Sequence, residues 1–306
     1  MRALLSSSAT TVLAVATFAA LLPAFAAAAE PTRLTHDGRL KFSPTFSADG
    51  ESIVYVELET PALYRLQRLR LADGSIEPVH ENAPTSQFEP AYSANGERFA
   101  FLHTRGTLSV SVVIRDLDSG AETEVLPGDG FSGLRAPALS PDGRQVAFAY
   151  AEGGLLRIDV VDLAEDGRTI GARRTLTSGA GLNNWPCWSP DGARIVFSST
   201  RDGDFDLYGM APDGSDARRL TASPRQDIRP RFSPDGDRIA FVSHRDGNAE
   251  LYVMPAAGGE ALRVTRHDER DDYPCWRPDG RRLVAVCERD GEHDLYWIDV
   301  PSISPR

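Results

Sequence analysis

Cysteine is scarce in this 306-residue sequence, which contains only three. An odd count leaves at least one thiol unpaired, and three cysteines are too few for the disulfide framework of a small secreted domain. Basic residues are also outnumbered, because 33 Lys and Arg stand against 44 Asp and Glu and give a net charge of −11. Since an acidic surface repels phosphate backbones, we expect no nucleic acid among the partners.

Motifs for nucleophilic or metal chemistry are missing as well. The segment nearest to a Gly-x-Ser-x-Gly elbow, Gly130–Gly133, lacks the required spacing. Asp202–Asp206 carries alternating carboxylates, but the sixth-position glycine and the twelfth-position glutamate of an EF-hand loop are absent. The histidines are dispersed, at positions 36, 80, 103, 244, 267 and 293. We therefore predict no catalytic residue, no metal and no cofactor, although distant residues that converge in space remain open.

The first 29 residues differ from the rest of the chain. Arg2 precedes an apolar stretch, Val12–Leu22, which is followed by Pro23 and a run of alanines. This pattern predicts a secretory signal peptide over residues 1–29, cleaved after one of the residues from Ala26 to Ala29. The alternative is an uncleaved membrane anchor, and both alternatives imply export. We expect a periplasmic or secreted protein with no membrane insertion after cleavage.

A repeat built around a Ser-Pro-Asp-Gly turn runs through the rest of the sequence. Its copies follow one another at intervals of 44 to 49 residues. A period of this length with strand-like content is typical of a four-stranded propeller blade. The turns lie at 47–50, 93–96, 140–143, 189–192, 233–236 and 277–280.

One unit, Arg229–Thr265, shows the predicted strands most clearly. We predict an innermost strand at Pro230–Ser233, followed by strands at Arg238–Ser243, Glu250–Met254 and Ala261–Thr265. Turns rich in Gly, Asp and Asn separate these strands, as hairpins require. Because several strands are apolar on both faces, the sheets are expected to stack against one another.

The ends of the chain predict how the ring closes. A fourth-strand pattern at Leu34-Thr35 precedes the first complete unit, whereas the last unit lacks its own and is followed by Pro301 and Pro305. The sequence therefore predicts an all-β fold over residues 30–306: a six-bladed β-propeller closed by the N-terminal strand pairing into the last blade. Closure hides both sheet edges, and we expect a monomer.

The repeats resemble those of TolB-like propellers, which are built from PD40 or WD40-like repeats. Trp188–Gly192, Asp206–Tyr208 and Leu220-Thr221 carry the resemblance, which is looser in the first three units, where Asn95 replaces aspartate and Leu139 replaces an aromatic residue. The resemblance implies the fold but not one function, since similar propellers occur in TolB and in front of prolyl-oligopeptidase-like peptidases. TolB also carries an α/β domain before its propeller. The few residues between the predicted leader and the first strand leave no room for one, so a role in the Tol-Pal system stays open.

Three units repeat a pair of opposite charges. An arginine recurs five residues before a carboxylate, and we predict an ion pair across each hairpin. The pairs are Arg201 with Asp206, Arg245 with Glu250, and Arg289 with Asp294.

Two of the cysteines, Cys187 and Cys275, occupy matching positions two blades apart, too far for a disulfide. Counting along the hairpin places Cys275 opposite Val284 or Ala285, so pairing with Cys287 is also excluded. We predict three buried free thiols.

Candidate binding residues lie just before each innermost strand, where the repeats differ and where propeller loops open onto the channel. They combine aromatic side chains with charges of both signs, which suits a peptide or protein segment. The alternative is that the aromatics only fill the channel. We predict a scaffold that binds an envelope protein or peptide without catalysis; the alternative is a hydrolase or lyase with a His/carboxylate site at the channel mouth. The candidates are Phe42, Phe88, Glu89, Arg135, Asn184, Trp185, Asp227, Arg229, Asp272 and Tyr273.

Overall fold

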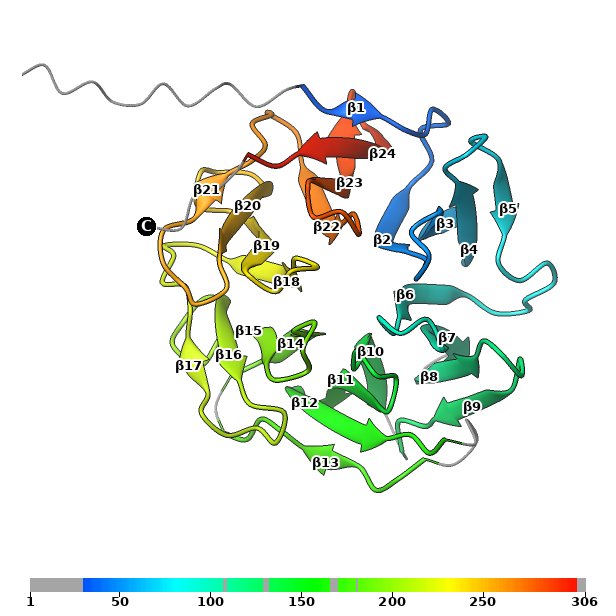
Figure 1. The fold of residues 1–306 in the computed structure, drawn as a ribbon, viewed down its shortest axis with the longest axis vertical. Coiled ribbons are helices and arrows are strands. Elements are labelled where there is room, and N and C mark those ends of the chain that lie inside the picture. The colour runs from blue at the N-terminus through cyan, green and yellow to red at the C-terminus, as the bar shows by residue number, and fades with distance from the viewer. Residues whose placement is uncertain (1–29, 107–108, 129–131, 166–169, 180, 302–306) are drawn as a thin grey trace, which may run out of the picture.

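The computed structural model describes residues 30–301, apart from 107–108, 129–131, 166–169 and 180 (Figure 1). The predicted signal peptide, residues 1–29, lies outside the described residues. Within the described part of the chain all regular elements are strands. That part accordingly contains no helix of the length and hydrophobicity needed to cross a membrane.

The strands form a ring around a central channel, in four rows from the inside to the outside (Figure 1). The innermost row is β2 (Lys41–Phe46), β6 (Gln87–Tyr92), β10 (Ser132–Leu139), β14 (Asn183–Trp188), β18 (Asp227–Phe232) and β22 (Asp271–Trp276). The second row is β3 (Ser52–Thr60), β7 (Arg98–Arg105), β11 (Gln145–Glu152), β15 (Ile195–Ser199), β19 (Arg238–Ser243) and β23 (Arg282–Arg289). The third row is β4 (Leu63–Arg70), β8 (Ser109–Asp116), β12 (Leu155–Asp162), β16 (Asp206–Met210), β20 (Glu250–Pro255) and β24 (Glu292–Asp299). The outer row is β1 (Thr32–Arg33), β5 (Ile76–Pro78), β9 (Glu122–Val125), β13 (Arg174–Thr175), β17 (Arg218–Arg219) and β21 (Leu262–Arg263).

The prediction of a six-bladed propeller is wrong. The ring contains four discrete four-stranded sheets and one continuous eight-stranded sheet, which runs from β6 to β13. The join is a parallel bridge between Gly133 of β10 and Val110 of β8. It forms because β10 has eight residues, whereas the other innermost strands have six. The sequence repeat does not show this extension, because the turn after β10 keeps its usual spacing.

The predicted stacking of doubly apolar strands accounts for the core. Every residue of β15 and β16 is buried. Side chains of one sheet pack on those of the next, so that Val196 and Leu207 share a cluster with Phe241 and Tyr252. Since burial of apolar surface is the main favourable contribution to folding, these contacts between sheets hold the ring together.

The Ser-Pro-Asp-Gly turns are reinforced by their own side chains. In the turn at 189–192 the Ser189 hydroxyl donates to Asp191 at 2.5 Å, and the amide of Arg194 donates to the Ser189 oxygen at 2.9 Å. Gly192 has a φ of 69°, which glycine adopts without strain. Hydrogen bonds from Ser189 and from the Ala193 amide lower the pKa of Asp191. Each turn therefore fixes the connection between an innermost strand and the second strand.

The predicted closure by the N-terminal strand is confirmed. β1 pairs antiparallel with β24, so that Thr32 lies opposite Trp297. Arg33 and the Thr35 hydroxyl both donate to Asp294, the latter at 2.5 Å. Lys41, the only lysine in the sequence, is fully buried beside this carboxylate, with its Nζ 3.2 Å from Asp294. Arg33, Thr35 and Lys41 therefore tie the start of the described chain to its last sheet.

The predicted ion pairs across the hairpins are wrong. Arg245 and Arg289 instead reach the innermost strands, where they pair with Asp227 at 2.9 Å and with Asp271 at 2.7 Å. The carboxylates point outward to arginines that flank or lie in the fourth strands. These pairs are Asp206 with Arg219, Glu250 with Arg263, and Asp294 with Arg33. The arginines fold inward because they stack on aromatic rings, as Arg245 does at 4.6 Å from the centroid of Tyr252.

The three cysteines are free, as predicted, and Cys275 lies opposite Val284. Only Cys287 is buried, however, and Cys187 and Cys275 are partly exposed. Both belong to innermost strands and line the central channel. The prediction that all three thiols are buried is therefore wrong for these two.

Candidate functional site

Each innermost strand is interrupted by a bulge at the same place. The bulge residues have φ between 46° and 56° although none of them is glycine, and each precedes a proline. The pairing register with the second strand shifts there in every case. A left-handed conformation costs a non-glycine residue about 1–2 kcal/mol, and such bulges commonly re-aim a side chain beside a site. The bulge residues are Ser43, Glu89, Ala136, Trp185, Arg229 and Tyr273, and all line the channel.

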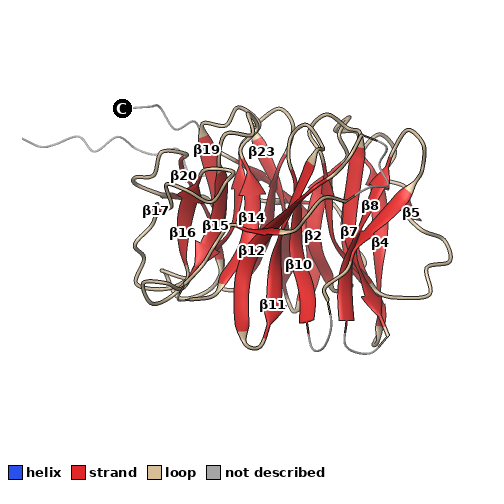
Figure 2. Ribbon diagram, turned by 90° about the horizontal axis from the view of Figure 1, so that it is seen from below, coloured by secondary structure: helices blue, strands red, loops and turns tan. Residues whose placement is uncertain are grey.

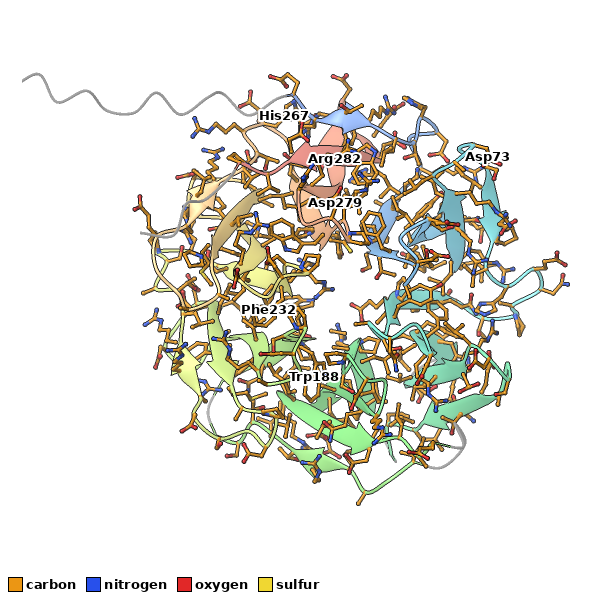
Figure 3. All side chains as sticks on the ribbon, viewed as in Figure 1. Asp73, Trp188, Phe232, His267, Asp279 and Arg282 are labelled. Carbon is orange, nitrogen blue, oxygen red and sulfur yellow. The ribbon has the colours of Figure 1, made fainter. Side chains whose placement is uncertain are left out.

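Two cavities meet at this ring of bulge residues. The channel cavity, of about 420 Å³, extends from the bulges to the Ser-Pro-Asp-Gly turns. The mouth cavity, of about 540 Å³, lies at the end of the ring where the innermost strands begin. Ser43, Glu89 and Tyr273 line both cavities. In Figure 3, side chains crowd the inner edge of the ring, where Trp188 and Phe232 lie, whereas Asp73 lies at the outer edge.

Aromatic rings form a continuous wall along one side of the mouth cavity. Tyr273 contacts Phe42 with ring centroids 5.8 Å apart, Phe42 contacts Tyr64 at 6.0 Å, and Tyr64 contacts Phe88 at 5.1 Å. These rings come from β22, β2, β4 and β6, so the wall crosses three sheets. Such rigid amphipathic side chains bury large areas of a ligand at a low entropic cost.

Arg229 extends this wall toward β14. Its guanidinium lies 4.8 Å from the Trp185 ring centroid and 4.2 Å from that of Tyr273, and it donates to the Tyr273 hydroxyl at 3.2 Å. Its charge is balanced by Asp272, with Nη1 and Oδ1 3.4 Å apart. Burial raises the pKa of Tyr273, so this phenol stays neutral beside the cation. The contacts hold Trp185, Arg229 and Tyr273 as one rigid group.

Polar neighbours stabilise the strained backbone. The Asn184 side chain accepts the amide of Trp185 at 2.9 Å, and Asp272 accepts the amide of Tyr273 at 2.6 Å. Both polar side chains are buried and therefore orient the aromatic residues that follow them. In the eight-stranded sheet, Glu89 accepts the amide of the bulge residue Ala136 at 2.5 Å.

The rim of the mouth is uneven. The second strands β3, β7, β11 and β23 continue two or three residues past the level where β15 and β19 end. At about 3.3 Å per residue, the strand pairing extends about 7–10 Å further in those sheets. Figure 2 shows β11 and β12 reaching further than β15 and β16. In the sheets of β14 and β18, which carry Trp185 and Arg229, the connections 200–205 and 244–249 replace this extra pairing.

The predicted site residues lie inside the innermost strands and not in the loops before them. Phe42, Phe88, Glu89, Trp185, Arg229 and Tyr273 line at least one of the two cavities, and Arg135 lines the mouth cavity as an exposed residue. Asn184 and Asp272 are buried and accept hydrogen bonds from the backbone amides of Trp185 and Tyr273. Asp227 does not join the group, because it is fully buried and pairs with Arg245 within its own sheet. Burial raises the pKa of Asp227, and hydrogen bonds from Ser243 and the charge of Arg245 oppose this.

Sequence reasoning missed Tyr64, Ser43 and Ala136. Tyr64 lies on a third strand, at a position that no repeated motif marks. The two bulge residues were detectable, because a proline three residues before each turn serine or its replacement marks the bulge in every repeat.

The histidines do not gather at the mouth. Neither cavity is lined by a histidine among the residues that the structure describes. In that same part of the chain, no cluster of three or more His, Cys, Asp or Glu side chains is arranged to hold a metal ion.

Comparison with known proteins places this geometry in a family. The family described as TolB beta propeller domain matches residues 53–230, more than half of the chain. The chain belongs to this TolB propeller family. A second family, the Tricorn protease N-terminal beta propeller domain, matches residues 206–300.

Individual relatives cover different parts of the propeller. The Tol-Pal system protein TolB of Anaeromyxobacter dehalogenans (strain 2CP-C) is 36% identical over 125 residues, which are 40% of this chain and 27% of that protein. A solved structure of a TolB candidate from Agrobacterium tumefaciens superposes with a TM-score of 0.67 and 24% identity, covering 88% of this chain and 93% of the other. An oligogalacturonate lyase in complex with manganese has a TM-score of 0.58 and 15% identity, covering 88% and 92%. The last two likenesses concern the fold alone.

Proposed function

We propose that this TolB-family propeller is an exported binding scaffold, located in the periplasm or secreted, that holds a segment of an envelope protein or peptide at its mouth. The observation that carries the proposal is the aromatic wall from Tyr273 to Phe88, which borders a cavity of about 540 Å³. Its rings are partly exposed, so they remain available for a partner.

Charge and shape support a peptide as the ligand. Arg135 is exposed at the rim and supplies a positive charge beside the apolar cavity, while Glu89 supplies a negative one. Apolar anchors provide binding energy and charges fix register, which is the usual division of labour at protein interfaces.

The proposal is tested with a photo-crosslinking amino acid at the position of Arg135, an exposed site whose replacement does not disturb the core. The protein is exposed to envelope extract and irradiated. We expect a discrete crosslinked product that weakens when Phe88→Ala is added. The matched control carries the same amino acid at Leu117, which is also exposed but lies in the turn after β8, at the opposite end of the ring. Equal products from both positions, or none from position 135, would refute the proposed mouth site.

A further inference from the structure

The channel cavity beyond the bulge ring contains an arginine without a carboxylate partner. Arg231 follows Arg229 on β18 and lines this cavity. Its guanidinium donates to the Pro230 carbonyl at 3.1 Å, and in the described part of the chain no carboxylate lies within ion-pair distance of it. Most other arginines of the ring reach a carboxylate, as Arg245 and Arg289 do. Arg231 is therefore a half-buried charge that the protein itself leaves uncompensated.

The space around Arg231 is open. The residues that follow the prolines in the innermost strands form one level of the channel wall, and all except Arg231 have small, uncharged side chains. They are Thr45, Ala91, Ala138, Cys187 and Cys275. These short side chains leave room for a ligand group in the middle of the channel, within reach of the guanidinium.

Nearby acidic side chains are engaged elsewhere. Glu89 is the only acidic residue that lines the channel cavity among the residues described, and its carboxylate accepts the Ala136 amide. Glu89 belongs to β6, and this strand lies across the channel from β18 (Figure 1). Asp235, in the turn that follows β18, accepts from Ser233 and pairs with Arg238. Because Asp272 balances Arg229, Arg231 is the cation of this cavity wall that has no carboxylate partner, and Glu89 is engaged with the Ala136 amide.

We infer that the channel binds a carboxylate at Arg231, so that the ligand of the mouth is a peptide whose acidic group follows its apolar anchor into the channel. This inference rests on the proposed function, because the anchor occupies the aromatic mouth cavity. Phe42 borders the mouth and Thr45 lies at the level of Arg231. Because the bulge lies between them, they pair with Val56 and Val54, which are two strand residues or about 7 Å apart. An extended ligand therefore needs its carboxylate about two or three residues after the anchor. The acid is a side-chain carboxylate or the C-terminal carboxylate of the ligand.

Three synthetic peptides test the inference by isothermal titration calorimetry. The first is acetyl-Phe-Gly-Gly-Glu amide, the second replaces Glu with Gln, and the third is acetyl-Phe-Gly-Gly-Gly with a free C-terminal carboxylate. A charge-assisted hydrogen bond in a partly desolvated site corresponds to about a tenfold to hundredfold gain in affinity. We expect one or both acidic peptides to bind at least about tenfold more tightly than the Gln peptide. The tighter of the two identifies the source of the carboxylate.

Variants separate the channel from the mouth. Arg231→Gln is expected to bring the three affinities within about twofold of one another, and Arg231→Lys to keep part of the preference. Arg218→Gln, which removes the same charge from the exposed outer strand β17, is expected to change nothing. Phe88→Ala is expected to weaken all three peptides equally.

Each result then decides one hypothesis. Equal binding of the acidic and Gln peptides, no binding of either acidic peptide, or a preference that survives Arg231→Gln overturns the carboxylate site. A preference that depends on Arg231 while Phe88→Ala has no effect upholds the channel site and refutes the aromatic mouth.

Discussion

Replacing Asp294 tests how the ring is closed. Asp294 accepts hydrogen bonds from Arg33 and Thr35 and lies beside the fully buried Lys41. Asp206 makes the same contacts with Arg219 and Thr221 in another sheet, but no lysine is near it. The two aspartates therefore form a matched pair that differs by one buried cation.

The expected magnitudes follow from what each substitution leaves behind. Asp206→Ala leaves a partly exposed arginine that can reach water, for a loss of about 1–3 kcal/mol in the free energy of unfolding. Asp294→Ala also removes the buried partner of Lys41, whose remaining carboxylate, Asp37, is partly exposed. Breaking a buried pair in this way costs about 3–5 kcal/mol.

Urea unfolding followed by tryptophan fluorescence measures both losses. We expect Asp294→Ala to be the more damaging by about 2 kcal/mol, and the difference to disappear when Lys41→Met is present in both proteins. Equal losses in the Lys41 background would show that the buried lysine is not part of the closure.

Other predictions concern acid, strain and accessibility. Burial alone would raise the pKa of Asp294, but hydrogen bonds from Thr35 and Arg33 and the charge of Lys41 outweigh it and hold the pKa below its ordinary value. Its contribution is thus present above the unfolded pKa and lost as pH falls through the folded one, so the stability gap between wild type and Asp294→Asn should narrow in urea titrations below about pH 4. Ala136→Gly relieves a left-handed residue and should raise the free energy of unfolding by about 0.5–1 kcal/mol in the same assay; a decrease would contradict the strain. Because burial raises the pKa of the Cys287 thiol, this cysteine should resist Ellman's reagent at pH 8 until guanidinium is added, and immediate reaction would refute its burial. Acylation of Lys41, read by mass spectrometry, should likewise be slow in wild type and faster in Arg33→Ala, and equal rates would show that β1 does not cover it.

Much of the fold was predictable because its signals are local. The Ser-Pro-Asp-Gly turns and the apolar strands repeat along the chain, and the spare strand at Leu34-Thr35 indicated the closure. The join between β8 and β10 was not predictable in this way. It depends on how far two strands of different repeats extend in space, which the turn spacing does not record.

The site residues were harder to assign to strands, because the bulges interrupt the sequence pattern by which a strand is predicted. A left-handed residue followed by proline breaks the alternation expected of a strand, so the pattern at Arg229-Pro230 looked like a strand start, although β18 begins at Asp227. The predicted ion pairs were wrong for a related reason, because sequence spacing does not record where a long side chain turns. Sequence spacing placed Arg245 near Glu250, but stacking on Tyr252 turns the guanidinium toward Asp227.

The repeated bulge explains how one scaffold presents unlike side chains at a common level. Backbone geometry is nearly the same at every bulge, with φ confined to a range of about ten degrees. The side chains differ from one bulge to the next. Ser43 and Ala136 leave space in the channel, whereas Trp185, Arg229 and Tyr273 fill it. Because the strain is common to all bulges, it cannot select among ligands. In the binding that we propose, specificity therefore comes from the positions that differ, with apolar anchoring at the mouth and the uncompensated charge of Arg231 two residues further along β18.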